Sequence, residues 1–222
     1  MEKLEEIKDI IILGAGGQSK NTSLVIEQTG KFNILGFVDD DTEKTGQSIR
    51  GYPILGTIDS VLQTQNNVSL AFAIGRPSII EKIATKIKEY AKEHDKNFMF
   101  PNIIHPSVQI DHKEVSMGEG NIIFPNVIFF AEISVGNFNF FNRCCSISHE
   151  TTIGNYNFIH SGAHLSGQIT IKNKAWVGLG STIIQCLTIN NNATIGAGAV
   201  VIKDVEENAI VVGNPAKLLR YK

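Results

Sequence analysis

The sequence predicts an α/β domain followed by a parallel β-helix, and three observations carry this prediction. Between Met117 and Val201 an apolar residue recurs at every sixth position, and asparagines recur at every eighteenth. Before that stretch, apolar strand-like runs alternate with helix-like segments. A period of six matches neither a helix nor a simple strand. It is typical of the hexapeptide repeat, in which each hexad forms one short strand and a corner.

The period of six runs through fifteen apolar positions without a break. In a chain that is 42% apolar, a run of this kind in any of six phases has a chance of about one in 10⁵. The repeated side chain is therefore expected to point into the prism. The series comprises Met117, Ile123, Phe129, Val135, Phe141, Ile147, Ile153, Ile159, Leu165, Ile171, Val177, Ile183, Ile189, Ile195 and Val201.

A second period, of eighteen residues, sets the length of one coil. Asn137, Asn155, Asn173 and Asn191 each stand two places after an apolar position. Three hexads therefore close one coil, and fifteen hexads make five coils. Asparagine tolerates the left-handed conformation of a tight corner, and stacked amides can hydrogen-bond from coil to coil, so we expect both at these positions.

Four phenylalanines are expected to point away from the prism, because they stand beside inward positions. These are Phe124, Phe130, Phe138 and Phe140, all in the first two coils. Together they predict an apolar patch on the outside of the β-helix, and we expect a partner subunit to cover it.

Composition narrows the classes of protein. A chain of 222 residues with net charge -2 gives no reason to expect a nucleic-acid partner. The start, MEKLEEIKDI, is acidic and lacks an apolar signal core, and the longest apolar runs are too short to span a bilayer. We therefore expect a cytoplasmic protein without membrane contact. Cys144, Cys145 and Cys186 lack metal-ligand spacing and are expected to be reduced thiols, so no metal site is predicted.

The first hundred residues read as a small parallel, Rossmann-like sheet with helical crossovers. Prolines at 101 and 106 mark the boundary, so the expected domains are residues 1–103 and 104–222. The expected elements are a strand from Asp9, a helix ending at Gly30, a strand at 33–41, a hairpin-like stretch near Gly51, a helix near 59–65, a strand at 68–75, a helix at 77–94 and a strand near 98–100.

A glycine turn joins the first strand to the first helix. Gly14, Gly16 and Gly17 stand where backbone N–H groups and a helix N-terminus can hold phosphate. The dinucleotide fingerprint is incomplete, because its third glycine is replaced by Ser19. This argues against an NAD enzyme, which stays an alternative.

The next strands end in polar or small residues at the same sheet edge. Asp39 and Asp40 follow the glycine turn by about twenty residues, where an acid can accept hydrogen bonds from a ribose or an amino group. They could equally be a solvated strand end. Gly75 ends the third strand at the edge where ligands of open α/β sheets bind, although a plain turn would also explain it.

His149 is the strongest candidate for catalysis in the β-helix. It occupies the corner position that asparagine holds elsewhere, with Ala131 one coil above and Gly167 one coil below. A coil without a side chain leaves room for a ligand and exposes a backbone N–H. A general base and an oxyanion donor need this arrangement.

Glu150 follows His149 directly and, at a corner, can reach back to the imidazole. Such a partner fixes the tautomer and raises the basicity of the other ring nitrogen. Glu132 lies eighteen residues earlier, so two carboxylates could lie close together, and one pKa would then rise. The alternative is that His149 and Glu150 are ordinary surface residues.

Two further histidines, His160 and His164, flank inward positions and are weaker candidates. Phe140, Phe158 and Trp176 recur at eighteen residues and are expected to form an outward aromatic ladder.

Several motifs resemble a known family. GAGGQ at 14–18, FVDDD at 37–41, AIG at 73–75, SHETTIG at 148–154, the WVGLGS and TIGAGA hexads and the ending VVGNPAK are similar to bacterial sugar acetyltransferases of the sialic acid O-acetyltransferase group. That group includes nucleotide-linked 4-amino-4,6-dideoxysugar N-acetyltransferases. The resemblance covers nearly the whole chain. It implies a left-handed β-helix, a homotrimer, acetyl-CoA in the groove between neighbouring β-helices, and a nucleotide-sugar in the N-terminal domain.

The resemblance also assigns roles by position. It implies that His149 is the general base, Glu150 its polarising partner and Gly167 the backbone donor near the thioester carbonyl. Where many members have a second histidine near acetyl-CoA, this chain has Phe158, so either His160 substitutes or the backbone alone holds the acetyl group. Residues implied to line the pantetheine are Leu179 and Ala197, and those implied for the nucleotide-sugar are Gly16, Gly17, Gln18, Asp39, Asp40, Gly75 and Asn142.

The expected activity is direct transfer of acetyl from acetyl-CoA to the 4-amino group of a nucleotide-linked sugar. The nucleotide could be UDP, dTDP or GDP. Two alternatives are an O-acetyltransferase acting on sialic acid or another sugar hydroxyl, and a β-helix scaffold without catalysis.

Overall fold

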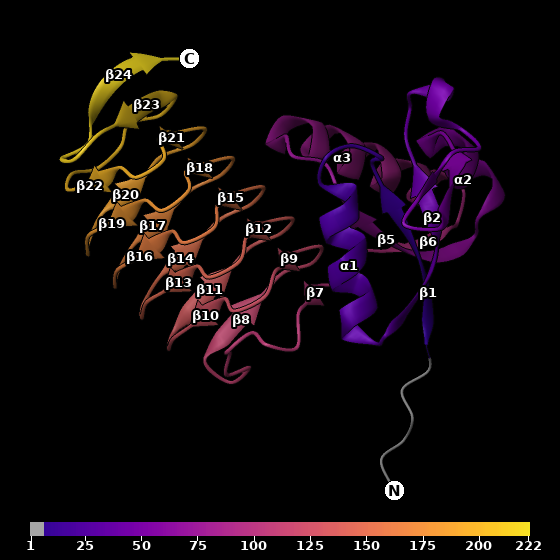
Figure 1. Ribbon diagram of the computed structural model, residues 1–222, viewed down its shortest axis with the longest axis horizontal. Coiled ribbons are helices and arrows are strands. Elements are labelled where there is room, and N and C mark those ends of the chain that lie inside the picture. The colour runs from indigo at the N-terminus through magenta and orange to yellow at the C-terminus, as the bar shows by residue number, and fades with distance from the viewer. Residues whose placement is uncertain (1–6) are drawn as a thin grey trace, which may run out of the picture. The chain divides into compact units, whose positions relative to one another are not determined.

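The computed structural model describes residues 7–222, and the chain divides between Ile103 and Ile104 into two compact units. The first six residues of the acidic start lie outside the described part. The first unit is a six-stranded sheet with helices, and the second is a β-helix (Figure 1). None of the helices within the described residues is long and apolar enough to cross a membrane.

The N-terminal unit has the predicted Rossmann-like alternation of strands and helices. Its strand order is β3-β4-β2-β1-β5-β6, with every neighbouring pair parallel except β3 and β4. The strands are β1 (Lys8–Leu13), β2 (Phe32–Val38), β3 (Ser48–Ile49), β4 (Tyr52–Gly56), β5 (Asn67–Phe72) and β6 (Asn97–Met99). The helices are α1 (Ser19–Thr29), the 3-10 turn η1 (Thr42–Lys44), α2 (Ile58–Thr64) and α3 (Pro77–Glu93).

Strand β1 lies inside the sheet, between β2 and β5, and is deeply buried. Its residues Ile10, Ile11, Ile12 and Leu13 are at most 1% exposed, as expected for a parallel strand covered on both faces. Because parallel strands run in one direction, β1, β2 and β5 all end at the same edge. That edge holds the first of the two candidate sites.

The C-terminal unit is the predicted β-helix, and it is left-handed. Within the coils each strand pairs in parallel with the third strand after it, eighteen residues further on, as in Ser146 with His164 and Phe140 with Phe158. The first sheet contains β10 (Ile128–Phe129), β13 (Ser146–Ile147), β16 (His164–Leu165), β19 (Thr182–Ile183) and β22 (Val200–Val201).

The remaining sides of the prism are two further sheets. One contains β8 (Val115–Met117), β11 (Ile133–Val135), β14 (Thr152–Ile153), β17 (Thr170–Ile171) and β20 (Thr188–Ile189). The other contains β7 (Ile103–Ile104), β9 (Ile122–Ile123), β12 (Phe140–Phe141), β15 (Phe158–Ile159), β18 (Trp176–Val177), β21 (Thr194–Ile195), β23 (Ala209–Val212) and the antiparallel β24 (Lys217–Tyr221).

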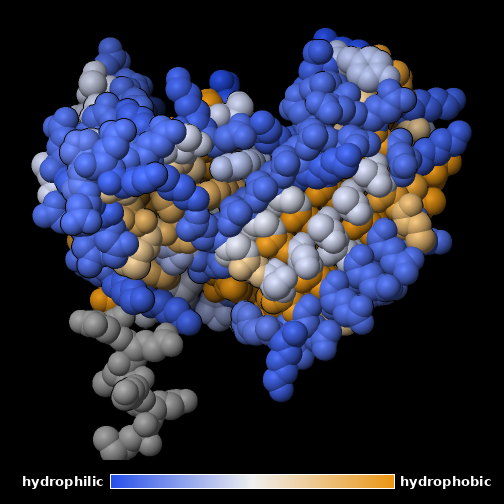
Figure 2. Space-filling model, turned by 180° about the vertical axis from the view of Figure 1, so that it is seen from behind, coloured by the Kyte–Doolittle hydropathy of each residue, from blue (hydrophilic) through white to orange (hydrophobic). Residues whose placement is uncertain are grey.

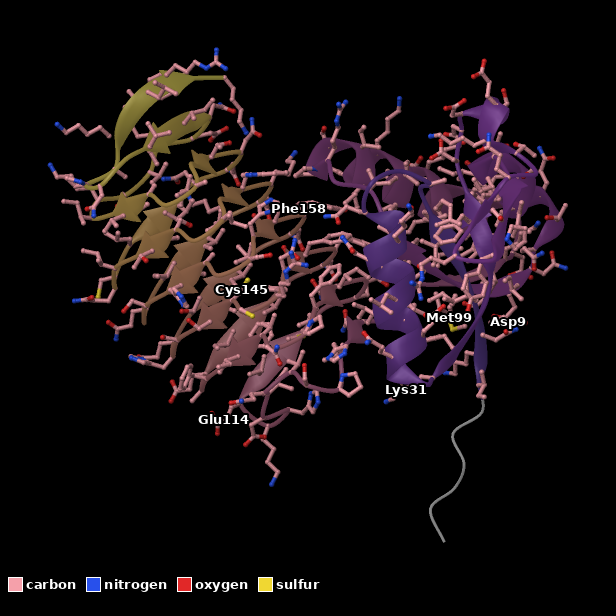
Figure 3. The ribbon with its side chains drawn as sticks, viewed as in Figure 1. Asp9, Lys31, Met99, Glu114, Cys145 and Phe158 are labelled. Carbon is pink, nitrogen blue, oxygen red and sulfur yellow. The ribbon has the colours of Figure 1, made fainter. Side chains whose placement is uncertain are left out.

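The period of six correctly predicts the interior of the prism. Fourteen of the fifteen residues in the series are buried, and the first, Met117, packs partly buried against them. Cys145, labelled in Figure 3, fills another inward position, and its Sγ lies 2.7 Å from the carbonyl oxygen of Asn142. Burial raises the pKa of this thiol to about 12, so Cys145 acts as a core residue rather than a nucleophile.

The asparagine ladder forms, but its residues do not adopt the predicted left-handed conformation. The backbone N–H of Asn137 donates to Oδ1 of Asn155 (2.8 Å), and that of Asn155 donates to Oδ1 of Asn173 (2.8 Å). The left-handed residues stand one place later, as in Phe138 and Tyr156, with φ of 56° and 59°. The asparagines are therefore needed for their amides, and the next residue makes the turn.

The predicted apolar patch on the first coils is mostly wrong. Phe124, Phe138 and Phe140 are at most 5% exposed, and only Phe130, at 55%, lies open. Two of the three buried rings stack on aromatic rings of the next coil, Phe138 on Tyr156 and Phe140 on Phe158. Pointing away from the prism therefore does not mean exposure. Figure 2 shows that side chains of similar hydropathy form parallel rows that run from one coil to the next.

Candidate functional site

The loop after β1 has the geometry of an anion site. Gly14 has φ of 106°, and a Cβ there would lie 2.7 Å from the side chain of Ile74, so only glycine fits. Gly16 and Gly17 are exposed, and nothing lies within 4 Å of a Cβ built on either. Because α1 begins at Ser19, two residues after Gly17, these backbone groups lie where the positive end of the helix dipole attracts an anion.

Asp39 shapes this loop from the end of β2. Its Oδ2 accepts a hydrogen bond from the N–H of Ala15 (2.7 Å), and its Oδ1 accepts from the N–H of Asp41 (3.0 Å) and from Lys44 Nζ (3.2 Å). Burial alone would raise the pKa of Asp39, but these donors outweigh it and lower the pKa. Both oxygens already accept hydrogen bonds within this region, so Asp39 holds the glycine loop in place.

Asp40 has a different environment from Asp39. It is exposed, and its Oδ1 accepts a hydrogen bond from the N–H of Ile58 (3.1 Å) at the start of α2. No described group donates to its Oδ2 in the hydrogen bonds of this region. Asp40 is therefore the carboxylate of this pair that remains available to a ligand.

A cavity of about 820 Å³ lies at this sheet edge, large enough for a nucleotide. It brings together six of the predicted residues, Gly16, Gly17, Gln18, Asp39, Asp40 and Gly75. The seventh, Asn142, belongs to the β-helix and follows β12. Sequence reasoning missed the two cations of the wall, Lys44 and Arg76, and the apolar lining, Ile58, Ile74, Ile79 and Ile83. Arg76 directly follows Gly75, so its position after the end of β5 could have predicted that it lines this cavity.

In the β-helix, His149 and Glu150 are in contact. His149 Nδ1 lies 2.9 Å from Glu150 Oε2, and the two side chains are 59% and 46% exposed. Since a carboxylate only accepts, Nδ1 carries the hydrogen and Nε2 is left as an acceptor. The contact is possible because Glu150 has φ of 55°, which breaks the strand alternation that would separate the two side chains.

The pKa of Glu150 is lowered, so the rise that we expected if two carboxylates lie close together does not occur at Glu150. The hydrogen bond with His149, and then one from Gln168, hold the pKa of Glu150 below its usual value. The carboxylate is therefore stabilised in its charged form, which is the form that polarises an imidazole.

Gly167 lies directly against the imidazole ring. A Cβ on Gly167 would lie 2.5 Å from His149 Nε2 and 2.6 Å from Cε1. The space that we expected for a ligand is thus occupied by the ring itself. Glycine is needed here because a side chain would collide with the ring, whose Nε2 lies close to the Gly167 backbone.

The backbone N–H of Gly167 donates to no acceptor among residues 7–222. At the corner that carries the asparagine ladder, the backbone N–H groups are paired. Asn137 and Asn155 each donate their N–H to Oδ1 of the asparagine in the next coil. By the same register the acceptor for the Gly167 N–H would stand at position 185, where the chain has Gln185 in place of asparagine, and the Gly167 N–H stays free. A free N–H beside a basic nitrogen is the pair of groups that an oxyanion and a proton donor require.

The residues expected to hold acetyl-CoA lie at other sides of the prism. Phe158, labelled in Figure 3, is buried in the predicted ladder, with ring centroids 4.7 Å from Phe140 and 5.4 Å from Trp176. Leu179, which is 59% exposed, and the exposed Ala197 follow β18 and β21 of the eight-stranded sheet. His149 and Gly167 follow β13 and β16 of a different sheet. One chain therefore does not bring the two groups together.

His160 is packed in the ladder rather than presented to solvent. Its ring lies 4.2 Å from that of Trp176, and its Nε2 is buried without a hydrogen-bond partner in the described residues. Desolvation lowers the pKa of His160. The ring is consequently kept neutral, as expected for an imidazole packed among aromatic side chains.

A smaller hollow of about 310 Å³ lies beside the His149 corner, on the outer face of the sheet that contains β13 and β16. Ser146 and His164 line it, and Ser146 Oγ lies 2.7 Å from His164 Nδ1. Ser148 and Ser166, which precede His149 and Gly167, line it as well. Within residues 7–222, no three His, Cys, Asp or Glu side chains are grouped closely enough to hold a metal ion.

The fold and site define a class of protein: a Rossmann-like domain with a ligand cavity, joined to a left-handed β-helix with a His–Glu pair at one corner. Residues 9–87 match the PglD N-terminal domain. No curated protein is significantly similar to the chain.

Solved structures are similar over nearly the whole chain. The acetyltransferase domain of PglB from Neisseria gonorrhoeae is 27% identical, with a TM-score of 0.86, covering 96% of this chain and 100% of that one. WeeI from Acinetobacter baumannii is 28% identical, with a TM-score of 0.82, covering 95% and 99%. PerB from Caulobacter crescentus, solved with CoA and GDP-perosamine, is 25% identical, with a TM-score of 0.87, covering 97% and 99%. The chain thus resembles bacterial sugar N-acetyltransferases of the hexapeptide-repeat type in fold and sequence, as its motifs predict.

Proposed function

We propose that the protein transfers acetyl from acetyl-CoA to the 4-amino group of a nucleotide-linked 4-amino-4,6-dideoxysugar, with His149 as general base. The observation that carries this proposal is the His149–Glu150 pair, whose Nδ1–Oε2 contact of 2.9 Å leaves Nε2 free above the Gly167 backbone. Similar structures support the substrates. The PglB domain was solved with acetyl coenzyme A, and PerB with CoA and GDP-perosamine.

The proposed reaction is a direct transfer. The sugar amine binds unprotonated and attacks the thioester carbonyl, while the Gly167 N–H donates to the developing oxyanion. His149 Nε2 takes a proton from the attacking nitrogen, and collapse of the intermediate breaks the C–S bond. The proton can then pass to the departing thiolate, giving the amide and CoA. Since an amine is already a good nucleophile, no acetyl-enzyme is required.

The N-terminal cavity is proposed to hold the nucleotide diphosphate. Three features support this role: the glycine loop at the start of α1, the guanidinium of Arg76 and the ammonium of Lys44. The loop offers N–H groups to phosphate oxygens. The guanidinium of Arg76 can also donate charge-assisted hydrogen bonds to a phosphate. The isoleucine lining offers an apolar surface to a base. Gln18, Asp39, Asp40 and Gly75 are proposed to contact the nucleotide-sugar as well, and Asn142 is proposed to contact its sugar.

The proposed active unit is a homotrimer. Leu179 and Ala197, proposed to line the pantetheine, lie at a different corner of the prism from His149 and Gly167. Only a second copy of the chain can place one corner beside the other. A closed ring of three copies would repeat this pairing three times. The buried Phe158 does not reach the acetyl group in this arrangement, and neither does the Nε2 of His160, so the backbone is proposed to hold it.

The first test is thiol release from acetyl-CoA in the presence of UDP-, dTDP- and GDP-linked 4-amino-sugars and free sialic acid. Rapid release with one 4-amino-sugar is the expected result, and it names the nucleotide. Release with sialic acid alone would move the function to O-acetylation. Silence with every acceptor, together with no affinity for acetyl-CoA, would favour a scaffold, and a parallel titration with NAD tests the remaining alternative.

His149→Ala is the matched test of the mechanism. Loss of general-base catalysis is expected to lower turnover about 10²- to 10⁴-fold, while binding of acetyl-CoA is retained, because the ring is not proposed to contact the cofactor. An unchanged turnover would remove His149 from the mechanism.

A further inference from the structure

A column of left-handed corner residues passes beside the His149–Glu150 pair. Glu150, Gln168 and Cys186 stand eighteen residues apart, with φ of 55°, 59° and 60°. Their backbones are linked in the same way, since Gln168 N–H donates to the His149 carbonyl (2.9 Å) and Cys186 N–H donates to the Gly167 carbonyl (3.1 Å). A shared conformation and shared links turn the three side chains to the same side of the corner.

Hydrogen bonds join these side chains in one direction. Gln168 Nε2 donates to Glu150 Oε2 (3.1 Å), and Cys186 Sγ donates to Gln168 Oε1 (3.1 Å). A carboxylate only accepts, and a thiol is the donor toward an amide oxygen. The two neighbours therefore fix which way the Gln168 amide faces. With the amide reversed, its oxygen would lie against the carboxylate.

Gln168 donates to the same Glu150 oxygen that contacts His149. His149 Nδ1 and Gln168 Nε2 approach the same atom, Glu150 Oε2, at 2.9 and 3.1 Å. Glu150 is 46% exposed, and a side chain in that position has several rotamers available in solvent. A second donor from the next coil selects the rotamer in which Oε2 faces the imidazole.

We propose that Gln168 is a positioning residue for the acetyl transfer, which holds the Glu150 carboxylate against His149, and that Cys186 in turn orients the Gln168 amide. This inference rests on the proposed function of His149. Gln168 touches neither substrate nor cofactor in it, and acts only through Glu150. Glu132, His149 and Cys186 are the other titratable side chains around this carboxylate, and Glu132 stands one coil before it in the column.

A titration tests the contact without any activity. Gln168 is one of two donors that keep the pKa of Glu150 below its usual value. In Gln168→Leu, the midpoint of the Glu150 carboxyl, followed by ¹³C NMR and assigned by its loss in Glu150→Gln, is expected to rise. An unchanged midpoint would mean that the amide does not hold the carboxylate in solution, and it would overturn the proposal.

A double-mutant cycle tests the role in catalysis. Gln168→Leu is expected to lower kcat about three- to tenfold, the effect of one hydrogen bond, with an unchanged KM for acetyl-CoA. In a Glu150→Gln background the same substitution is expected to add nothing, because residues that act through one another are not additive. An equal loss in both backgrounds would show a merely structural role.

Substitutions of Lys174 and Cys186 serve as controls for Gln168→Leu. Lys174→Leu changes the same left-handed corner position at another edge, with φ of 58°, and is expected to leave kcat unchanged. Cys186→Ser keeps a donor to the Gln168 amide and should retain the wild-type kcat, whereas Cys186→Ala should lose part of it. If the wild type acetylates no acceptor, the proposed function fails, and the carboxyl titration still decides the contact.

Discussion

Two histidines of the β-helix show how the surroundings of a residue decide its role. His149 is 59% exposed, has a carboxylate at Nδ1 and keeps Nε2 open. His160 lies in an aromatic stack, with a buried Nε2 that has no partner among the described residues. His149 can exchange a proton during a reaction, whereas burial disfavours the protonated form of His160. The sequence places His149 at a corner and His160 beside an inward position, but counting along the chain does not show that the His160 ring is buried.

The buried imidazole predicts a pH dependence of stability. Since burial lowers the pKa of His160 from its ordinary value of 6.5, the unfolded chain takes up a proton first as the pH falls through that value. The free energy of unfolding is therefore expected to decrease below about pH 6.5, and to keep decreasing until the folded imidazole is protonated. Urea denaturation at pH 7.5 and pH 5.5 measures this decrease.

The control for this prediction is His160→Phe, which keeps a ring against Trp176 and removes the titrating group. It is expected to lose less stability between the two pH values than the wild type, whereas His112→Phe, at an exposed position, should behave like the wild type. Equal losses in wild type and His160→Phe would refute the assignment.

At the scale of one coil, stability depends on buried amides as well as on the apolar row. Asn157 is fully buried. Its Nδ2 donates to the Lys172 carbonyl (2.8 Å), and its Oδ1 accepts from the N–H of Ala175 (2.7 Å). These bonds link the coil of Asn157 to the following coil. An apolar residue at this position could not form them.

Asn157→Ala is predicted to destabilise the chain by about 2 to 4 kcal/mol, because it leaves a buried N–H and a buried carbonyl without partners. Thermal or urea unfolding measures the change. Thr170→Ala, on the exposed face of β17, is the matched control and should have little effect. A similar loss in both variants would show that the amide bonds are not what holds the coils together.

The contacts between coils also explain what the sequence could and could not predict. The period of six gave the interior, and the period of eighteen gave the ladder and the His149–Gly167 neighbours, because both follow from counting. Gln168 stands eighteen residues after Glu150, so the same count could have found its contact. The burial of Phe124, Phe138 and Phe140 could not be counted, since it depends on how their rings pack.

For the whole molecule, the central prediction is that each active site uses two chains. His149→Ala removes the base from one corner, and Ala197→Trp is expected to block the other corner. Each variant alone should be inactive as a homotrimer. Coexpression with two different tags, followed by purification on both, yields trimers that contain both variants. Every such trimer has one intact interface, so about one third of wild-type activity is expected.

An inactive mixture would mean that a single chain holds the whole site. Sedimentation of the purified mixture, performed alongside the assay, checks that the chains do assemble as trimers. The activity per trimer then separates a shared site from a failure to assemble.

At this scale the N-terminal cavity was the more predictable of the two candidate sites. Five of its residues follow from the rule that ligands bind at the carboxyl ends of parallel strands, and the sixth, Gln18, follows from the resemblance. Lys44 and Arg76 were missed, because a cavity wall is made of segments far apart in the chain, and only the fold shows which of them face one another.

The eighteen-residue register has a consequence for how such a chain can change length. Inserting or deleting eighteen residues within the prism adds or removes one coil and leaves every column in line. Inserting six residues between His149 and Gly167 would instead turn the later coils by one side, and the imidazole would face a different corner. The β-helix can therefore lengthen or shorten by whole coils during evolution, while smaller changes in this region would separate His149 from Gly167, the proposed base and the proposed oxyanion donor.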